Sequence, residues 1–141
     1  MPTFQKASAY LNTATNVTAG NFIEVPIDTV IYDPSGIVST ANHRITPTVA
    51  GYYLCTGLVA AGSVNSLLAC LTKNGVVTPL YAYGTEAATL VGGGSISTVT
   101  SLISLNGSTD FVQLGCQNQG AGTAALAIAT QFNLLTVLGP F

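Results

Sequence analysis

Short runs in which hydrophobic and polar residues alternate follow one another along the whole chain. In Gly51–Val59, for example, Tyr53 and Cys55 fall on one side of an extended strand and Leu54 falls on the other. Such a period of two residues predicts β-strands. No segment combines sustained helical spacing with helix-forming residues, and even the alanine-rich stretch 122–131 alternates. The pattern therefore predicts an all-β chain.

Turn-forming residues separate these runs at regular intervals. Asn74-Gly75 favours the two positive φ angles of a type I′ hairpin turn, and Asp33–Gly36 predicts a second turn. About ten short strands with turns between them are typical of a two-sheet antiparallel sandwich or of a barrel. The predicted strands are Phe4–Leu11, Phe22–Val25, Val30–Tyr32, Arg44–Thr46, Gly51–Val59, Leu67–Thr72, Val76–Tyr83, Ser95–Leu105, Phe111–Cys116, Ala124–Gln131 and Phe132–Leu138.

The chain has few charged residues for a soluble domain. It has 141 residues, which predicts a single domain over 1–141, and no linker divides it. Charged residues make up 6% of the chain, against about 25% in ordinary domains, and the net charge is -2. Either the surface is neutral and rich in hydroxyls, as in many extracellular or virion proteins, or other subunits cover much of it. This charge argues against nucleic acid or an anionic membrane as a partner.

The first residues and the cysteines indicate the cellular compartment in which the chain is made and folds. The start, from Met1, has no apolar signal-peptide core, and no apolar run approaches the ~18 residues of a membrane span. We therefore expect synthesis in a cytoplasm and no membrane partner. Cys55, Cys70 and Cys116 lie among apolar strand residues, which favours free buried thiols. A bridge between Cys55 and Cys70 is the alternative.

Residues for catalysis and metal binding are scarce. His43 is the one histidine, and no Gly-x-Ser-x-Gly nucleophile motif occurs. The sequence thus predicts no enzyme and no cofactor site. It also predicts no metal site, because calcium would need more carboxylates than Asp28 or Asp110 can supply. Tyr81 and Tyr83 share one strand face, which favours a place in the core or an interface, with a sugar-stacking platform as the alternative.

Several short motifs follow one another along the chain. They are Tyr32-Asp-Pro-Ser-Gly, Ile45-Thr-Pro-Thr-Val-Ala-Gly-Tyr-Tyr-Leu, Leu71-Thr-Lys-Asn-Gly, Leu102-Ile-Ser-Leu-Asn-Gly-Ser-Thr-Asp-Phe-Val-Gln-Leu and Phe132-Asn-Leu-Leu-Thr-Val. With these motifs, the chain from Phe22 to Val137 is similar to the globular head domain of the complement C-one-q family, which shares its jelly roll with tumour necrosis factor. Three departures stand out: Cys55 in place of a Phe, Leu134 in place of a Gly, and two extra residues, Ser108 and Thr109, in one turn.

The resemblance implies an all-β, two-sheet antiparallel jelly-roll sandwich of about ten strands. It also implies a homotrimer, with aromatic and aliphatic side chains packed along the threefold axis, and closed cyclic symmetry is the usual assembly for such units. The candidates for the core or the trimer interface are Tyr53, Tyr81, Tyr83, Phe111, Phe132 and Leu134.

Two functions remain open at this stage. By analogy of fold, the first is a structural virion protein, a trimeric decoration or cement protein on a phage capsid, whose partner is the lattice of the major capsid protein. The alternative is the receptor- or glycan-binding tip of a phage fibre or bacterial surface protein. In the first case, Met1–Asn16 with Phe4, Lys6 and Tyr10 is a candidate capsid anchor. Otherwise this stretch supplies the first strand of the sandwich.

Overall fold

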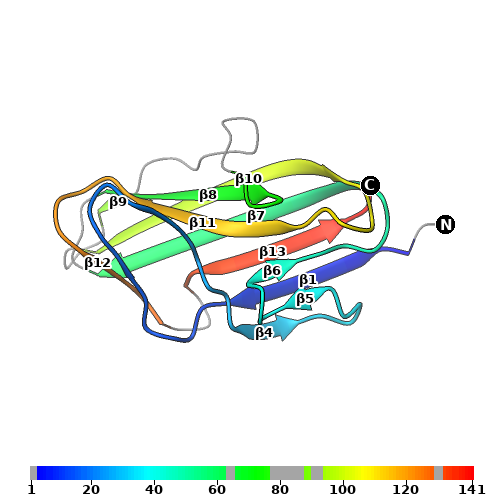
Figure 1. Cartoon of the computed structure of the whole chain (residues 1–141), viewed down its shortest axis with the longest axis horizontal. Coiled ribbons are helices and arrows are strands. Elements are labelled where there is room, and N and C mark those ends of the chain that lie inside the picture. The colour runs from blue at the N-terminus through cyan, green and yellow to red at the C-terminus, as the bar shows by residue number, and fades with distance from the viewer. Residues whose placement is uncertain (1–2, 63–65, 77–87, 90–93, 129–131) are drawn as a thin grey trace.

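Every regular element that the structure describes is a β-strand (Figure 1). The computed structural model describes residues 3–62, 66–76, 88–89, 94–128 and 132–141. No helix in these ranges is long and apolar enough to cross a bilayer. The strands are β1 (Gln5–Tyr10), β2 (Asn16–Val17), β3 (Phe22–Glu24), β4 (Thr29–Tyr32), β5 (Val38–Ser39), β6 (Arg44–Ile45), β7 (Gly51–Gly62), β8 (Leu67–Lys73), β9 (Ala88–Thr89), β10 (Ser95–Leu105), β11 (Val112–Asn118), β12 (Ala124–Leu126) and β13 (Leu134–Gly139).

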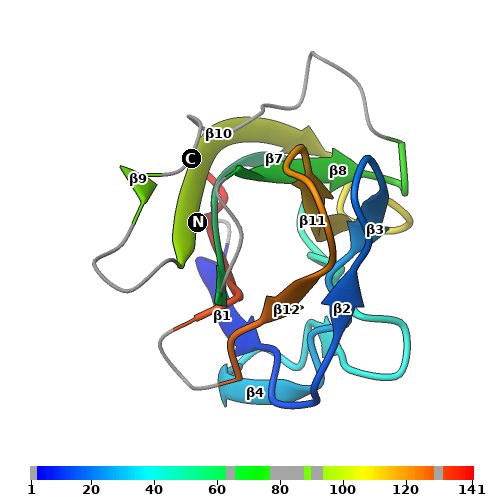
Figure 2. The same ribbon diagram turned by 90° about the vertical axis from the view of Figure 1, so that its left-hand side faces the viewer.

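These strands form two antiparallel sheets that lie against each other. The large sheet has the order β2-β12-β7-β13-β1-β4, and β10 extends it from β7, with β9 on β10. The small sheet has the order β3-β11-β6-β5. β3 and β6 pair with successive parts of one edge of β11, and β8 pairs with its other edge. Figure 2 shows the two layers, with β10 and β7 on one side and β11 and β3 on the other. The prediction of a two-sheet antiparallel jelly roll is confirmed.

The core lies between the sheets and is built from alternate residues of their long strands. Tyr53 and Cys55 of β7 and Leu114 of β11 have no exposed surface. The sheets approach closely at Gly57, where a Cβ atom would lie 2.5 Å from the Leu114 side chain and 3.0 Å from that of Val99. Interiors pack at the density of organic crystals, so this position excludes a larger residue.

The predicted turns form as expected. Asn74 and Gly75 have φ angles of 55° and 73°, the two positive values that a type I′ turn requires. Val76 then makes an isolated bridge to Lys73, and residues 77–83 of the predicted return strand lie outside the described residues. In the second turn, both carboxylate oxygens of Asp33 accept backbone N–H bonds from the residues that follow, at 2.9 Å.

Two strands end well away from their predicted ends, while the other predicted strands that the structure describes shift by at most a residue or two. β7 continues to Gly62, because Ala61 pairs with Ser95 of β10 and Gly62 pairs with Ala125 of β12. β12 ends at Leu126, short of the predicted end at Gln131. After it, Ala127 N donates to Ala60 O at 2.9 Å. The extension of one strand depends on partners distant in sequence, which alternation alone does not reveal.

Candidate assembly face of the large sheet

Three rows of outward-pointing side chains cross the large sheet at right angles to its strands. Directly opposed residues of antiparallel strands point to the same side, so the register of the strands defines each row. The leucine row consists of Lys6, Leu138, Leu54 and Leu102. The hydroxyl row consists of Tyr32, Ser8, Thr136, Thr56 and Thr100. The tyrosine row consists of Tyr10, Leu134, Leu58 and Thr98. We call the three rows together the assembly face.

The assembly face exposes apolar surface that a soluble monomer would be expected to bury. Leu102 is 57% exposed and Tyr32 is 46% exposed, while Leu54, Leu58 and Leu138 are half-buried. The residues between them along each strand point inward and are buried in the core, except Ser101 of β10, which is half-buried. Contiguous exposed apolar surface of this kind marks an interaction site more often than scattered single residues do.

The assembly face carries little charge. Lys6 is the one ionic side chain in the three rows, and its Nζ atom lies 4.9 Å from the centroid of the Tyr32 ring. This cation–π contact keeps the ammonium group against an aromatic surface. Depletion of charge is the compositional mark of the centre of a protein–protein interface.

Both chain ends lie at the same end of the molecule (Figure 1), and exposed aromatic side chains gather there. We call Phe4, Tyr52 and Phe141 the aromatic end; they are 51%, 54% and 69% exposed. The rings of Phe4 and Phe141 pack edge to face, with centroids 5.9 Å apart and an interplanar angle of 74°. Phe141 N also donates to Tyr52 O at 2.9 Å, so the last residue is tied to β7.

The predicted interface and core residues occupy different environments. Leu134 lies in the tyrosine row, and Phe132 is half-buried just before β13. Tyr53 is fully buried, and its hydroxyl donates to Val49 O at 2.7 Å. Phe111 is half-buried, with the Arg44 guanidinium 4.4 Å from its ring centroid. Tyr81 and Tyr83 lie outside the described residues.

The residues considered as a capsid anchor divide between two places. Lys6 and Tyr10 belong to β1, which pairs with β13 on one side and β4 on the other. Tyr10 is only 8% exposed. Phe4 precedes β1 and belongs to the exposed aromatic end. Of the three, Phe4 is therefore the residue best placed to contact another molecule outside the three rows.

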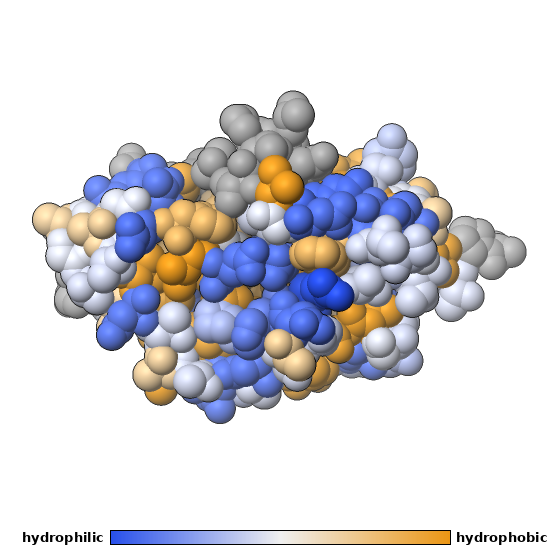
Figure 3. All heavy atoms as spheres, in the orientation of Figure 1, coloured by the Kyte–Doolittle hydropathy of each residue, from blue (hydrophilic) through white to orange (hydrophobic). Residues whose placement is uncertain are grey.

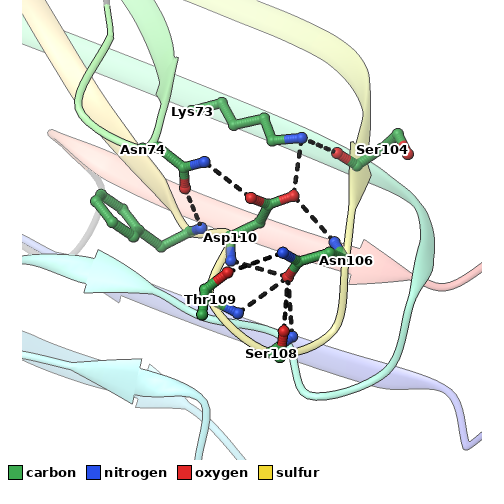
Figure 4. Close-up of polar contacts among 8 residues, drawn as sticks. Lys73, Asn74, Ser104, Asn106, Ser108, Thr109 and Asp110 are labelled. Carbon is green, nitrogen blue, oxygen red and sulfur yellow. Dashed lines mark hydrogen bonds and ion pairs between the residues drawn. The ribbon is translucent and has the colours of Figure 1, made fainter.

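A network of polar contacts surrounds Asp110 at the loop between β10 and β11 (Figure 4). Lys73 Nζ lies 2.8 Å from Asp110 Oδ2 and donates to Ser104 O at 2.7 Å. Asn74 Nδ2 donates to Asp110 Oδ1 at 2.8 Å, and Asn106 N donates to Asp110 Oδ2 at 3.0 Å. These bonds, with that of Asn74 the strongest, hold the pKa of Asp110 below its ordinary value of 3.8. Asp110 thus satisfies N–H groups of its own loop and of the neighbouring Asn74.

The second carboxylate considered for calcium is also engaged within the chain. Asp28 Oδ1 accepts hydrogen bonds from Asn12 N at 2.8 Å and Thr29 Oγ1 at 2.9 Å. Among the described residues, no three His, Cys, Asp or Glu side chains lie close enough together to hold a metal ion. The described surface also has no pocket that could enclose a small ligand.

Comparison with known proteins defines the fold. No family model matches the sequence, and no curated protein matches it. Solved structures do match: murine APRIL has a TM-score of 0.66 at 11% identity and covers 96% of this chain and 98% of its own. Eiger TNF from S. frugiperda has a TM-score of 0.64 at 13% identity, covering 100% and 94%. The globular domain of a zebrafish complement 1qA protein has a TM-score of 0.63 at 9% identity, covering 97% and 97%.

The fold is the jelly roll of tumour necrosis factor and complement C-one-q. The structure explains how this jelly roll accommodates the three departures noted in the sequence. Asn106 Oδ1 accepts bonds from Ser108 N, Thr109 N and Asp110 N, so the two extra residues close into a capped turn. Cys55 fills a buried core position, and Leu134 adds an aliphatic side chain to the assembly face.

The three cysteines contribute packing to the jelly roll. All are buried and free, which confirms the first of the two interpretations of their positions. Burial raises the pKa of each of the Cys55, Cys70 and Cys116 thiols to about 12. A thiol acts as a nucleophile in its ionised form, so all three are unreactive at neutral pH.

The hydroxyl row is the feature that the sequence did not predict. Alternation alone places Thr56 and Thr100 on an outward face, which is a signal present in the sequence. The row exists, however, because β1 pairs with β13, and Ser8 and Thr136 are separated by 128 positions. A pairing over such a distance cannot be read from one sequence.

Proposed function

We propose that this chain forms a homotrimer through its assembly face, and that the trimer is a structural unit without enzymatic activity. The observation that carries the proposal is the three rows of aliphatic, hydroxyl and aromatic side chains on the outside of the large sheet. The occupant is two further copies of the chain, as the resemblance to the C-one-q family implies. The lack of a pocket or metal cluster in the described ranges supports a role in association.

The energetics favour association through this face. Burial of apolar surface is worth roughly 25 cal/mol per Å², and obligate interfaces often bury ~2,000 Å² or more. Because Lys6 is the one ion in the rows, the desolvation cost of charged groups is small. The proposal also accounts for a composition with only 6% charged residues.

The test places a charge in the assembly face. In the variant Leu102→Glu, a carboxylate replaces a side chain that is 57% exposed in the protomer. Burial of an unpaired charge costs several kcal/mol, so we expect monomers at micromolar concentration in sedimentation velocity, with the circular dichroism of the protomer unchanged. Ile128→Glu is the matched control, because Ile128 is 52% exposed and lies outside the rows. A trimeric Leu102→Glu protein would contradict the proposal.

In its finer form, we propose that the trimer decorates a phage capsid and cements the lattice of the major capsid protein. Support comes from the charge-poor, hydroxyl-rich composition and from the aromatic end, where Phe4 and Phe141 expose two rings beside each other. The aromatic end adjoins the leucine row, because Tyr52 lies two residues before Leu54 in β7 and opposite Ser104 of β10. We place the lattice contact at this edge of the assembly face, where the chain ends lie.

Capsid binding tests this finer form. The trimer should bind purified capsids of the source particle in a fixed stoichiometry and raise the temperature at which they open. The variant Phe4→Ala/Phe141→Ala should remain trimeric and lose this binding, because it removes two of the three rings of the aromatic end, the pair that pack on each other. Binding to host cells or to glycans, without binding to capsids, would contradict the decoration role and favour the tip of a fibre.

A further inference from the structure

Two asparagine–glycine sequences meet around one carboxylate at the end of the sandwich. Asn74-Gly75 forms the hairpin turn after β8, and Asn106-Gly107 lies in the loop between β10 and β11. β8 pairs with β11, which brings the two turns together. Asp110 accepts a hydrogen bond from each of them: Asn74 Nδ2 donates to Oδ1 at 2.8 Å, and Asn106 N donates to Oδ2 at 3.0 Å (Figure 4).

An asparagine followed by glycine is prone to deamidation. The backbone nitrogen of the glycine attacks the side-chain carbonyl carbon of the asparagine and closes a cyclic imide. The proton of that nitrogen passes through water to the amide nitrogen, which leaves as ammonia, and a water molecule then opens the imide to aspartate or isoaspartate. Glycine has no Cβ that hinders the attack, and Asn74 and Asn106 are both exposed to water. The rate in the folded chain therefore depends on how firmly each amide is held.

The Asn74 amide is bonded at both of its polar atoms, and one of the two bonds depends on Asp110. Phe111 N donates to Asn74 Oδ1 at 3.0 Å, while Asn74 Nδ2 donates to Asp110 Oδ1. Deamidation expels the nitrogen that bonds to Asp110, so this charge-assisted bond must break first. The product is opposed too, because an aspartate at position 74 places a second carboxylate beside that of Asp110, and like charges repel.

The Asn106 amide is held without the Asp110 side chain. Its Oδ1 accepts hydrogen bonds at 2.9 to 3.0 Å from the backbone N–H groups of Ser108, Thr109 and Asp110. Its Nδ2 donates to Thr109 Oγ1 at 2.8 Å. Three N–H groups that converge on one oxygen also stabilise a carboxylate. An aspartate at position 106 would therefore keep this turn intact.

We propose that Asn74 and Asn106 are deamidation sites of this chain, and that Asp110 is the positioning residue that keeps the Asn74 site closed. Without the Asp110 carboxylate, the Asn74 amide loses one of its two bonds, whereas the Asn106 amide keeps the bonds of its own turn. The fold tolerates the product at Asn106 and resists it at Asn74. This inference does not depend on the homotrimer.

The test follows deamidation at each site in the folded protein. Wild type, Asp110→Ala and the control Lys73→Met are kept at mildly alkaline pH, and mass spectrometry of their peptides measures aspartate and isoaspartate at positions 74 and 106. Wild type unfolded in urea gives the reference rate. Lys73→Met removes the ion pair with Asp110 and leaves the acceptor of Asn74 Nδ2 in place, so it controls for a general loss of stability.

Folded wild type and Lys73→Met should deamidate more slowly than the unfolded chain at both sites. In Asp110→Ala, the rate at Asn74 should rise about tenfold, as expected for the loss of one hydrogen bond to a charged group, and the rate at Asn106 should change much less. Equal acceleration at both sites would overturn the role of Asp110, because it would indicate general loosening. A folded wild type that deamidates at Asn74 as fast as the unfolded chain would overturn it as well.

A second measurement introduces the two products directly. Asn74→Asp should lower the urea midpoint of unfolding, because its carboxylate faces Asp110. Asn106→Asp should leave the midpoint unchanged or raise it, because the three N–H groups hold the new carboxylate. Equal destabilisation by the two substitutions would refute the difference between the sites.

Discussion

The outer faces of the two sheets differ in how far the protomer itself covers them. On the small sheet, the outward side chains of Cys70, Thr72 and Gln113 are only 1%, 0% and 5% exposed. The ring of Phe22 lies over Gly115, and Gln113 Nε2 donates to Glu24 Oε2 at 2.9 Å. On the large sheet, the assembly face leaves Leu102 57% exposed. The protomer thus completes one face by itself and leaves the other open.

Surface chemistry supports this division between the two faces. Figure 3 looks onto the side of the small sheet, where hydrophilic residues cover much of the surface between smaller hydrophobic areas. The assembly face carries one ion in its three rows. Alternation predicts outward-pointing residues on both sheets and does not distinguish the two faces. The exposed apolar surface of each face in the folded protomer does distinguish them, and it locates the face that needs a partner.

The largest effect should come from opening the small sheet. In Gly115→Val, the added side chain would occupy the place of the Phe22 ring and of Cys70 Sγ, both 2.5 Å from a Cβ at this position. We expect a loss of about 2 to 3 kcal/mol in the free energy of unfolding, measured by urea denaturation. Cys70 should also become reactive towards iodoacetamide at pH 8. Gly62→Val is the control, because no atom lies within 4 Å of a Cβ there, and a similar loss in both variants would contradict the account.

An intermediate effect should come from the polar loop at the end of the sandwich. Asp110→Asn removes the ion pair with Lys73, whose atoms lie 2.8 Å apart, and should cost the protomer about 1 to 2 kcal/mol. Because the folded-state pKa of Asp110 lies below 3.8, its contribution is present above pH 3.8 and is lost as the pH falls below it. Urea denaturation at pH 7 and pH 3 should therefore show a difference between the two proteins that shrinks in acid. A constant difference would show that the carboxylate charge is not responsible.

The smallest effect on the protomer should come from the one ion of the assembly face. Lys6→Met keeps a long side chain beside Tyr32 and removes an exposed charge, so the free energy of unfolding of the protomer should change by less than about 0.5 kcal/mol. Burial of the ammonium group no longer opposes association, so the trimer should dissociate less on dilution. Weaker association of Lys6→Met, measured by sedimentation, would place Lys6 in a favourable contact between copies.

Much of the fold could be predicted from local signals. The alternation in 51–59, the Asn74-Gly75 turn and the carboxylate of Asp33 act over a few residues, and each forms as the sequence indicates. Asn133 was missed, since it lies in a predicted strand but has a φ of 53° and is fully buried. Its Oδ1 accepts a bond from Ala60 N at 3.0 Å, a partner 73 positions away.

The location of the assembly face could be predicted less well, because it depends on which strands pair and not on the alternation within each strand. Leu134 was predicted at an interface or in the core, and the register places it in the tyrosine row beside Leu58. The hydroxyl row and the aromatic end combine residues from both ends of the chain, such as Phe4 and Phe141. These residues share one surface because strands far apart in the sequence pair with each other. The local pattern of a single sequence does not show which strands pair.

The most direct test of the open assembly face is the mass of the wild-type protein in solution. Sedimentation velocity from high to low micromolar concentration should show a single species of three times the 14.3 kDa protomer mass. The account predicts that this species persists on dilution, because two further copies cover the leucine and tyrosine rows. A stable species of 14.3 kDa across the same range would contradict it.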